Sequence, residues 1–308
     1  MNTFAFLTNP NTISKFSLFW PVKRAFNVSR IKKIRSTNGK ETEGFLIFLP
    51  LSPQQILDLS NGLLSEKIIS ASEIAGRLGA GILGLGGQIS LSANNNYKKI
   101  KLPMTSGNSL TAWSIFEAVY RTSRIKRVDF KNSCLTVIGA SEPLGVLCAK
   151  KFSYCLPKII INSKKREELY AIKENISNLN PIEVIIEEDV NKAIKDADIV
   201  INTGNSPDIT FDTQNLKSGA IYGDIFSLRN SKPDFNAETT VINAGLIKLP
   251  FRGEIISAAM AETMLLALEG KFVNYSSGGD SNLDNLEEIA DIAAKHGFEV
   301  WVPEAPVL

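Results

Sequence analysis

The second half of the chain alternates short apolar runs with stretches of helical spacing. Between residues 133 and 243 the apolar runs are separated by polar or amphipathic segments. Short strands that alternate with helices are typical of a parallel sheet covered by helices on both faces. The sequence therefore predicts a doubly wound, Rossmann-type domain here. The expected strands are residues 133–138, 158–162, 184–187, 199–202, 221–223 and 241–243, and the expected helices are residues 146–152, 166–176 and 190–195.

The first half of the chain predicts a separate α/β domain. Its apolar runs are short, its longer stretches have helical spacing, and glycines and prolines lie between them. The basic and polar segment 121–131 is expected to lead into the second domain. The expected strands are residues 3–7, 45–49 and 82–83, and the expected helices are residues 53–57, 65–78 and 110–120.

The last part of the chain predicts two helices and no strand. Residues 257–268 are apolar nearly all round, so this helix should be buried, and residues 283–296 are amphipathic. Helices without strands of their own should pack back on the first domain. We therefore expect an N-terminal substrate domain (1–125), a dinucleotide-binding domain (126–252) and returning C-terminal helices (253–308), with the active cleft between the two domains.

The first turn of the Rossmann-type domain resembles a nucleotide-binding turn, with two changes. Gly139 is placed for the tight turn, Gly145 for close packing of the helix, and the segment between them, including Ser141 and Leu144, would line the phosphate site. Glu142 stands where a glycine usually lets a phosphate approach the backbone, and Pro143 has no amide hydrogen to donate. The turn is therefore stronger evidence for the Rossmann-type fold than for a bound nucleotide.

Three cations follow the second expected strand of this domain, in Ser163-Lys164-Lys165-Arg166. Enzymes that select NAD usually place a carboxylate there, whereas cations suit the 2′-phosphate of NADP. The alternative is a solvated start of a helix. After the fourth strand, a polar loop that contains Thr203 and Asn205 would lie near the nicotinamide ribose, although Asn, Ser and Gly also mark ordinary turns.

Two loops of the first domain are candidates for substrate contact. One is the glycine-rich segment 84–88, and the other is the segment 105–111. The second places Ser106, Asn108, Ser109 and Thr111 at the start of a helix, where hydroxyl and amide groups can polarise a carbonyl oxygen or bind an anion. An N-terminal cap without further function is the alternative.

Composition and charge exclude several classes of protein. The 308 residues, 44% of them hydrophobic and 21% charged, suit two ordinary globular domains, and a net charge of +2 argues against a broad nucleic-acid surface. No apolar run approaches the ~20 residues of a membrane span, and no signal-peptide pattern is present, so we expect a cytoplasmic protein. The three cysteines lack metal-ligand spacing and are expected to be buried free thiols. His296, before Gly297, suits a helix end better than catalysis.

Taken together and in this order, several motifs of the chain resemble the cyanobacterial-type long-chain acyl-[acyl-carrier-protein] reductase family and its shorter, shikimate-dehydrogenase-like bacterial relatives. The resemblance extends from about Phe4 to Val300. It implies reduction of a fatty acyl thioester to an aldehyde with NADPH, through a cysteine on the buried C-terminal helix. The motifs are residues 4–7, 84–87, 105–112, 139–145, 197–200, 261–266, 269–270 and 295–298.

Three positions depart from the family pattern. Ala259 stands where the family has its cysteine, Asn9 where it has a histidine, and Glu142 where it has a glycine. An alanine cannot form a thioester. We therefore expect an NADP-dependent oxidoreductase that transfers a hydride to a carbonyl or imine without a covalent intermediate. The alternative is a catalytically silent relative that binds a partner subunit or a small-molecule or acyl-thioester ligand, which an acyl carrier protein could present.

Overall fold

The computed structural model describes residues 1–9, 26–92, 100–204, 211–225, 235–251, 253–276 and 282–302. The chain divides into two compact units. Unit 1 comprises Met1–Leu110, Ile247–Asp280 and Asp284–Glu299, and unit 2 comprises Thr111–Leu246, Ser281–Leu283 and Val300–Leu308. The C-terminal helices α8 (Ala258–Glu269) and α9 (Leu283–His296) therefore belong almost entirely to unit 1, as the sequence predicts.

Unit 1 contains a five-stranded sheet in the order β2-β3-β1-β4-β5. Neighbouring strands are parallel except for β2, which pairs antiparallel with β3 at the edge. The central strand β1 is buried on both faces, which is typical of a parallel strand covered by helices. The strands are β1 (Asn2–Thr8), β2 (Asn27–Arg35), β3 (Glu41–Phe48), β4 (Ile82–Leu85) and β5 (Met104–Thr105).

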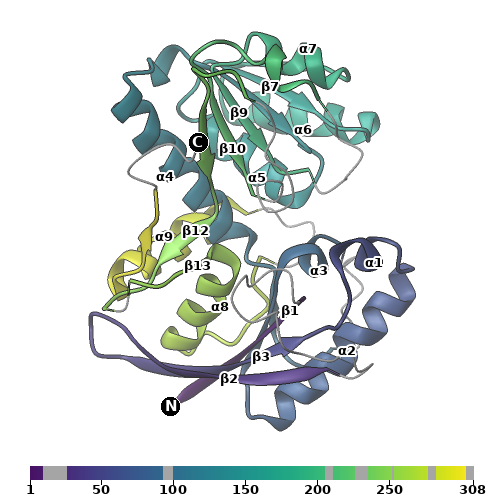
Figure 1. Ribbon diagram of the computed structural model, residues 1–308, viewed down its shortest axis with the longest axis vertical. Coiled ribbons are helices and arrows are strands. Elements are labelled where there is room, and N and C mark those ends of the chain that lie inside the picture. Colours follow the sequence, from purple (N-terminus) through teal and green to yellow (C-terminus); the bar gives the residue numbers. More distant parts are fainter. Residues whose placement is uncertain are drawn as a thin grey trace. The chain divides into compact units, whose positions relative to one another are not determined.

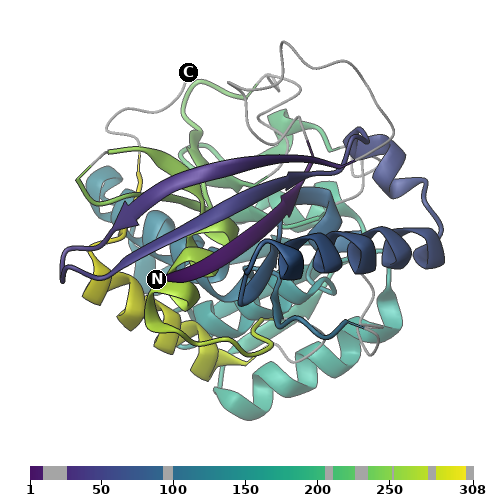
Figure 2. The same ribbon diagram turned by 90° about the horizontal axis from the view of Figure 1, so that it is seen from below.

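Helices α2 and α8 cover opposite faces of the unit 1 sheet (Figures 1 and 2). Ala5 and Leu7 share a core with α2 (Asn61–Arg77), while Phe6, on the other face of β1, lies beside Gly84 and Thr263 of α8. A Cβ on Gly84 would overlap the Thr263 hydroxyl, so the missing side chain lets α8 approach the sheet closely. The helix that is apolar nearly all round is thus buried against the sheet, as predicted.

Unit 2 contains a six-stranded parallel sheet in the order β11-β10-β9-β6-β7-β8. This is the strand order of a doubly wound dinucleotide-binding fold, in which the order reverses between β6 and β9. The predicted fold class is confirmed. The strands are β6 (Cys134–Ile138), β7 (Lys158–Asn162), β8 (Glu183–Ile186), β9 (Ile199–Asn202), β10 (Ile221–Asp224) and β11 (Thr240–Asn243), and the helices between them are α5 (Pro143–Phe152), α6 (Arg166–Leu179) and α7 (Val190–Lys195).

Helix α4 (Asn108–Lys126) is longer than the sequence indicated. The segment 121–131 was expected to be a connection, but Thr122 and Ser123 are buried while Arg121 and Arg124 face solvent, so the helix continues. Lys and Arg are good helix formers, so a basic stretch with one buried face can form the end of a helix as readily as a linker. A 3-10 turn, η4 (Phe130–Asn132), follows before β6.

Several short elements were missed by the sequence analysis. A small sheet in the order β13-β12-β14 contradicts the expectation that no strand follows residue 252. Strands of two or three residues carry no measurable period, and the exposed edge strand β2 carries charges rather than an apolar run. The missed elements are β12 (Leu246–Lys248), β13 (Ile255–Ser257), β14 (Glu299–Val300), α3 (Gly87–Ser92) and η5 (Thr213–Asn215). The short helix α1 (Pro53–Leu57), with its Ser52 capping box, was predicted.

The three cysteines differ in their exposure to solvent. Cys148 is buried and Cys134 is half-buried, and burial raises the pKa of the Cys134 thiol to about 11. Cys155 is exposed, so the expectation of three buried thiols is wrong for it.

Among the described residues no helix is both long and apolar enough to cross a membrane. The same residues include no cluster of three or more His, Cys, Asp or Glu side chains that could hold a metal ion.

Candidate functional site

The glycine turn between β6 and α5 has the conformation that the sequence predicts. Gly139 has a φ of +77°, where side chains are disfavoured, and a Cβ on it would lie 2.6 Å from the backbone of Gly204. A Cβ on Gly145 would overlap the carbonyl oxygen of Gly139. Thr203 donates its hydroxyl hydrogen to the Ile138 carbonyl oxygen over 2.9 Å. The loops after β6 and β9 therefore meet where the strand order reverses, which is where doubly wound sheets bind ligands.

The start of α5 offers fewer donors than a usual phosphate-binding helix. Glu142 is the N-cap residue, and its side chain makes no capping hydrogen bond, while Pro143 occupies the first turn. The amides of Leu144 and Gly145 donate to no acceptor within the described part of the chain. Two amide donors thus remain for an anion, in a turn whose backbone already has the right shape.

The Glu142 carboxylate is paired rather than isolated. Its Oε1 lies 3.4 Å from Lys165 Nζ, and the hydroxyl groups of Ser141 and Ser163 lie 2.5 Å apart between the two loops. A carboxylate beside a phosphate is repulsive unless a cation neutralises it. Here the cation is supplied by the segment that the sequence assigned to the 2′-phosphate of NADP.

The other cations after β7 are also engaged. Arg166 Nε lies 2.9 Å from Glu188 Oε1, and the Arg166 guanidinium donates to the Tyr170 hydroxyl over 3.1 Å. Lys164 is exposed at the same loop. The four residues after β7, residues 163–166, contain no carboxylate. Asn205, the remaining candidate for the ribose, lies outside the described residues.

In unit 1, the loop after β5 is fastened to α8 by the buried side chain of Glu262. Thr105 donates its hydroxyl hydrogen to Glu262 Oε1, and the Leu110 amide donates to Oε2 over 2.8 Å. Glu262 is fully buried. Burial raises the pKa of its carboxyl, and hydrogen bonds from Thr105, Leu110, Ser276 and Gly107 offset only part of that rise. The Glu262 carboxyl group therefore fixes both ends of the loop 105–110 through hydrogen bonds.

The predicted substrate loop residues separate into two groups. Ser106 donates to the Ser276 carbonyl oxygen, and the hydroxyl oxygens of Ser276 and Ser109 lie 2.6 Å apart. Asn108 is the half-buried first residue of α4. Thr111 is buried one turn further along the helix and belongs to unit 2, so the structure does not group it with the serines.

Other polar groups gather at the same carboxyl edge of the unit 1 sheet. The Thr8 hydroxyl, at the end of β1, and Gln88 Oε1, just after β4, are buried without a hydrogen-bond partner in the described structure. Ser90 of α3 donates to the Ser106 carbonyl oxygen over 3.0 Å, so α3 lies against the same loop. Buried polar atoms without partners are costly, and a polar ligand would satisfy them.

Ala259 lies directly beside this loop. It occupies the first turn of α8, and a Cβ on Gly107 (φ +77°) would overlap both the Cα and the Cβ of Ala259. Asn9, the second departure from the family pattern, is 1% exposed at the end of β1. Two of the three departures are therefore located at the carboxyl edge of the unit 1 sheet, and the third, Glu142, at the glycine turn of unit 2.

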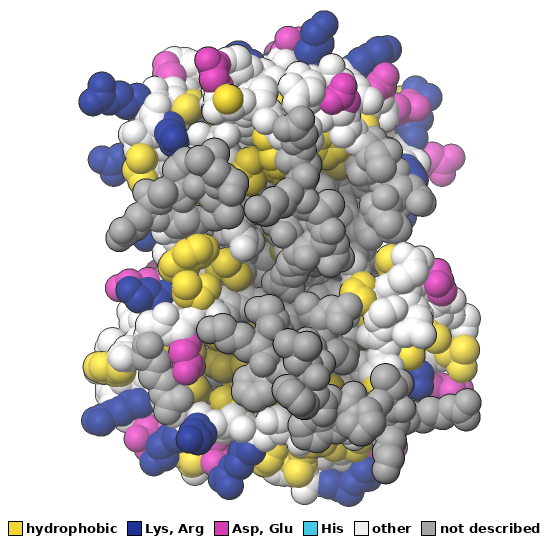
Figure 3. Space-filling model, viewed as in Figure 1, with side chains coloured by type: hydrophobic (Ala, Val, Ile, Leu, Met, Phe, Trp, Pro, Cys, Tyr) yellow, Lys and Arg dark blue, Asp and Glu magenta, His cyan; other side chains and the backbone are white. Residues whose placement is uncertain are grey.

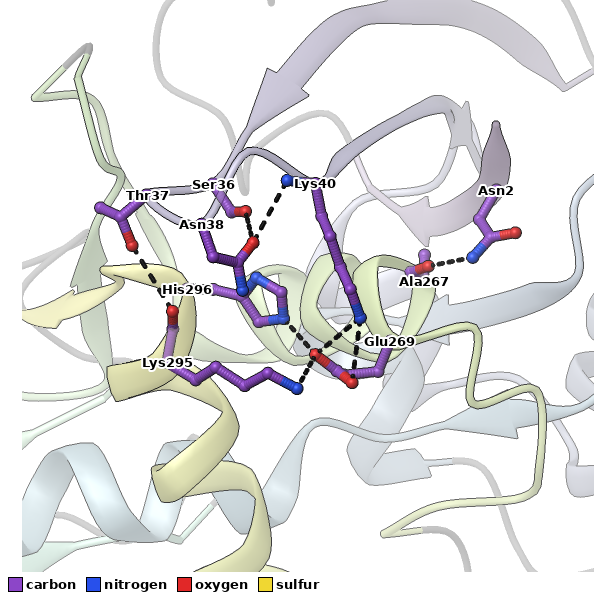
Figure 4. A network of polar contacts seen from close by, with 9 residues as sticks. All are labelled: Asn2, Ser36, Thr37, Asn38, Lys40, Ala267, Glu269, Lys295 and His296. Carbon is purple, nitrogen blue, oxygen red and sulfur yellow. Dashed lines mark hydrogen bonds and ion pairs between the residues drawn. The ribbon is translucent and has the colours of Figure 1, made fainter.

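His296 takes part in a charged cluster of unit 1 rather than in a simple helix cap (Figure 4). The Glu269 carboxylate, at the end of α8, accepts from His296 Nε2 at 2.5 Å and Lys295 Nζ at 2.8 Å, and Lys40 Nζ lies 3.3 Å away. His296 is fully buried. Burial lowers its pKa, and the bond to Glu269 offsets only part of that effect. Gly297 has a φ of +74°, as expected after a helix end.

We expect this cluster to make unit 1 sensitive to acid. Burial opposes ionisation of Glu269, but hydrogen bonds from Lys295, His296 and Lys40 outweigh it and lower the pKa of that carboxyl to about 2. Both folded-state pKa values lie below the unfolded ones, so the stabilisation is present at pH 7. It is lost as the pH falls, first through the ordinary His range and then from 4.5 towards 2. After allowance for screening by water, the Glu269 contribution should be on the order of 1–2 kcal/mol.

Urea unfolding at pH 7, 5 and 3 measures this loss. The matched variant is Glu269→Gln, which keeps the shape of the side chain and removes its titration. It should be less stable than the natural chain at pH 7 and should lose less stability between pH 5 and pH 3. Equal pH dependence of the two proteins would show that the cluster does not cause it.

Sequence reasoning missed Glu262 and Ser276 as site residues. Glu262 could have been found, because a carboxylate within a helix that is apolar nearly all round must be paired or hydrogen-bonded. Ser276 has a φ of +50° in an irregular segment, and nothing in the local sequence marks it.

Comparison with known proteins gives distant curated relatives, two of which are described here. An aminotransferase named PigE from a Serratia species is 25% identical over 293 residues, which are 87% of this chain and 34% of that protein. A long-chain acyl-[acyl-carrier-protein] reductase from Synechococcus elongatus is 23% identical over 297 residues, which are 86% of this chain and 85% of that protein. The chain thus spans about a third of the aminotransferase and most of the reductase. No family model matches it.

Solved structures of similar fold are also distant. Ligand-free 5-ketofructose reductase from a Gluconobacter species has a TM-score of 0.45 and 10% identity, with 94% of this chain and 98% of that chain covered. Quinate dehydrogenase from Corynebacterium glutamicum, solved in complex with NAD, has a TM-score of 0.39 and 14% identity, with 72% and 82% covered. The fold assignment of unit 2 follows from its own strand order.

Proposed function

We propose that the chain is an NADP(H)-dependent oxidoreductase, distantly related to acyl-thioester reductases, that reduces a carbonyl or imine without a covalent intermediate. The observation that supports this most is the crevice of unit 2. A doubly wound sheet reverses its order at β6 and β9, and two open amides of α5 lie at that point beside a left-handed glycine.

The residues of unit 2 fit a dinucleotide once existing ion pairs rearrange. Leu144 and Gly145 would donate their amides to a phosphate oxygen, and Ser141 and Ser163 would supply hydroxyls at its rim. Lys164, Lys165 and Arg166 would face the 2′-phosphate. The Glu142–Lys165 and Arg166–Glu188 pairs must shift for this, because both cations are otherwise engaged. A nicotinamide cofactor, when bound, supplies the hydride.

Unit 1 would bind and polarise the substrate. The Ser109 hydroxyl lies 2.6 Å from the Ser276 hydroxyl, in a hydrogen-bonded group that includes the Glu262 carboxyl group. It would donate to a carbonyl oxygen as negative charge develops there. Ser106 and Glu262 would not contact the substrate but would position the loop 105–110 by their hydrogen bonds. Hydride transfer to a carbonyl needs a bound cofactor and a polarised substrate, but no nucleophile.

Nucleotide titration tests the proposal. Quenching of intrinsic Trp fluorescence, or calorimetry, would be followed with NADPH and with NADH. NADPH should bind more tightly by about tenfold, because a charge-assisted contact with the 2′-phosphate contributes on the order of 1.5–3 kcal/mol and breaking existing ion pairs takes back part of it. Tighter binding of NADH would contradict the choice of NADP, and no binding of either would contradict the oxidoreductase.

A second proposal is that the chain is a catalytically silent relative that binds an acyl or small-molecule ligand, or a partner subunit. The structure favours it in two places. Glu142 stands where a glycine would let a phosphate approach the backbone, and Pro143 has no amide hydrogen to donate. Ala259, in the first turn of α8, is not a nucleophile. The same nucleotide titration separates the two proposals.

We also expect that the protein forms no thioester-linked intermediate. Ala259 is not a nucleophile, and α8 contains no cysteine. Intact mass spectrometry after incubation with acyl-CoA should show no added acyl group on this helix, and a stable adduct that maps there would contradict the expectation. The informative variant is Ala259→Cys, because a thiol in the first turn of a helix ionises more readily. It should acquire an acyl adduct if the loop beside Gly107 admits a thioester.

A further inference from the structure

The carboxyl group of Glu262 lies in surroundings that disfavour a negative charge. Figure 3 shows Asp and Glu side chains of the described residues at the outer surface, where water solvates them. Glu262, by contrast, is fully buried in the apolar helix α8. Within the described structure no Lys, Arg or His makes an ion pair with it, and burial raises its pKa. The surroundings therefore favour the protonated form, because a buried acid without a cation keeps its proton.

The Ser276 hydroxyl is the contact through which a proton can leave Glu262. Thr105 donates its own proton to Glu262 and accepts from the Gly107 amide over 3.2 Å. The Leu110 amide donates to the carboxyl group and cannot accept from it. Ser276 also hydrogen-bonds to the carboxyl group. Because a hydroxyl oxygen can accept two hydrogens while it donates one, Ser276 can take the Glu262 proton and release its own.

Ser276 connects this carboxyl group to Ser109, near the start of α4. The two hydroxyl oxygens lie 2.6 Å apart, and the Ser109 amide donates to the Ser276 hydroxyl oxygen over 3.2 Å. Ser109 is 1% exposed and Ser276 is 8% exposed, so bulk water does not compete for these contacts. All three residues belong to unit 1. Two hydroxyl groups thus form a continuous path of hydrogen bonds from Glu262 to the loop 105–110.

The path is satisfied with its hydrogens in either direction. When Glu262 is protonated, it donates to Ser276, which donates to Ser109, and the Ser109 proton is left for an acceptor outside the path. When Glu262 is ionised, Ser109 donates to Ser276 and Ser276 donates to the carboxylate. The Ser109 amide bonds to the Ser276 oxygen in both arrangements. Such a path can carry one proton outward and be reset afterwards.

Ser276 is held in a strained backbone conformation at the centre of the path. Its φ is +50°, in the left-handed region that serine rarely occupies. The segment is fixed next to β5, because the Tyr275 amide donates to the Met104 carbonyl oxygen over 2.9 Å and Ser106 donates to the Ser276 carbonyl oxygen. Strained residues that surrounding contacts hold in place are found mainly at functional sites.

From these observations we infer that Glu262 supplies the proton of the proposed reduction, through Ser276 and Ser109 in turn. As hydride adds to the carbonyl carbon of the substrate, the π electron pair moves to the oxygen, which takes the Ser109 proton. Ser109 takes the proton of Ser276, and Ser276 takes that of Glu262, which is left as a carboxylate. Solvent returns one proton along the path after the product leaves. This role rests on the proposed function, whereas the path itself does not.

Infrared spectroscopy of the full chain, without nucleotide or substrate, tests whether Glu262 is protonated. At pH 7 the difference between the natural chain and Glu262→Gln should contain the C=O stretch of a protonated carboxylic acid. The matched control is Glu288→Gln, the same change at a carboxylate of unit 1 whose side chain is 44% exposed. It should give no such band. Absence of the band from the Glu262 difference would overturn the inference.

Exchange of the same proton in D2O tests the path. The carboxylic acid band moves to lower frequency when deuterium replaces the proton. Ser276→Ala and Ser109→Ala each interrupt the path, so exchange must wait for local opening and should slow at least about tenfold. The control is Ser90→Ala, which removes a hydroxyl that donates to the Ser106 carbonyl oxygen outside the path. It should change the rate less than about twofold.

The sign of the change separates a proton path from simple support of the loop. Loss of support would loosen the loop and speed up exchange, whereas loss of the path slows it. Faster or unchanged exchange in Ser276→Ala or Ser109→Ala, or equal slowing in Ser90→Ala, would overturn the inference. Because the infrared test requires no nucleotide, nucleotide titration of the same samples shows separately whether the proposed oxidoreductase fails.

Discussion

Glu262→Ala is expected to lower the free energy of unfolding by about 3–5 kcal/mol, the largest change that we expect from a single substitution in this chain. The substitution leaves the Thr105 hydroxyl and the Leu110 amide without their acceptor in a fully buried place. Each buried polar group left unsatisfied costs about 1–3 kcal/mol, and the missing carboxyl group leaves a cavity in addition. Urea or thermal unfolding measures the change.

Glu262→Gln is the matched control, because it keeps the shape and most of the hydrogen bonds. Its carbonyl oxygen can accept from the Leu110 amide, and its amide hydrogen can be donated to the Thr105 hydroxyl, which turns to accept it. We expect a loss of less than about 1.5 kcal/mol. A glutamine variant as unstable as the alanine variant would show that the negative charge, rather than the hydrogen bonds, holds the loop 105–110.

The regular part of the fold could be predicted because its strands and helices carry clear periods. Residues 199–202 are all buried, and α7 and α9 have the bounds that their spacing predicts. The glycines at 139 and 145 identify the turn at the crevice, since each lacks the space for a Cβ. The local sequence pattern is sufficient to predict an element when its propensity, its period and its packing all agree.

The site was predicted less completely, because its contacts connect residues far apart in the sequence. Lys165 looked available for a phosphate, yet it pairs with Glu142 on another loop. Ser109 was a candidate from its place at a helix start, but the groups that hold its loop, Glu262 and Ser276, follow more than 150 residues later. Spacing along a chain does not reveal such partners, since tertiary contacts choose them.

Substitution of Glu142 is expected to change nucleotide binding more than any other single change in unit 2. Glu142→Gly should tighten NADPH binding about fivefold or more, because removal of an anion–anion conflict at a partly exposed site is worth on the order of 1 kcal/mol or more. The substitution also releases Lys165, whose Nζ lies 3.4 Å from the carboxylate. Fluorescence titration with NADPH and NADH measures both effects.

The two effects can be separated by their nucleotide dependence. Relief of repulsion at the pyrophosphate should help NADPH and NADH alike, whereas release of Lys165 should help only the nucleotide with a 2′-phosphate. The control is Glu168→Gln, which removes the other carboxylate near Lys165, at 3.8 Å, without changing the start of α5. It should therefore give only the part of the gain that depends on the 2′-phosphate.

The outcome also decides between the two proposed functions. If the natural chain binds no nucleotide and Glu142→Gly does, Glu142 closes the site, and the chain is a silent relative whose turn has kept its glycines at 139 and 145. If the natural chain already binds NADPH and the substitution changes nothing, Lys165 has neutralised the carboxylate and the oxidoreductase stands. The prediction of tighter binding is then wrong, because the paired carboxylate does not repel the phosphates in the bound state.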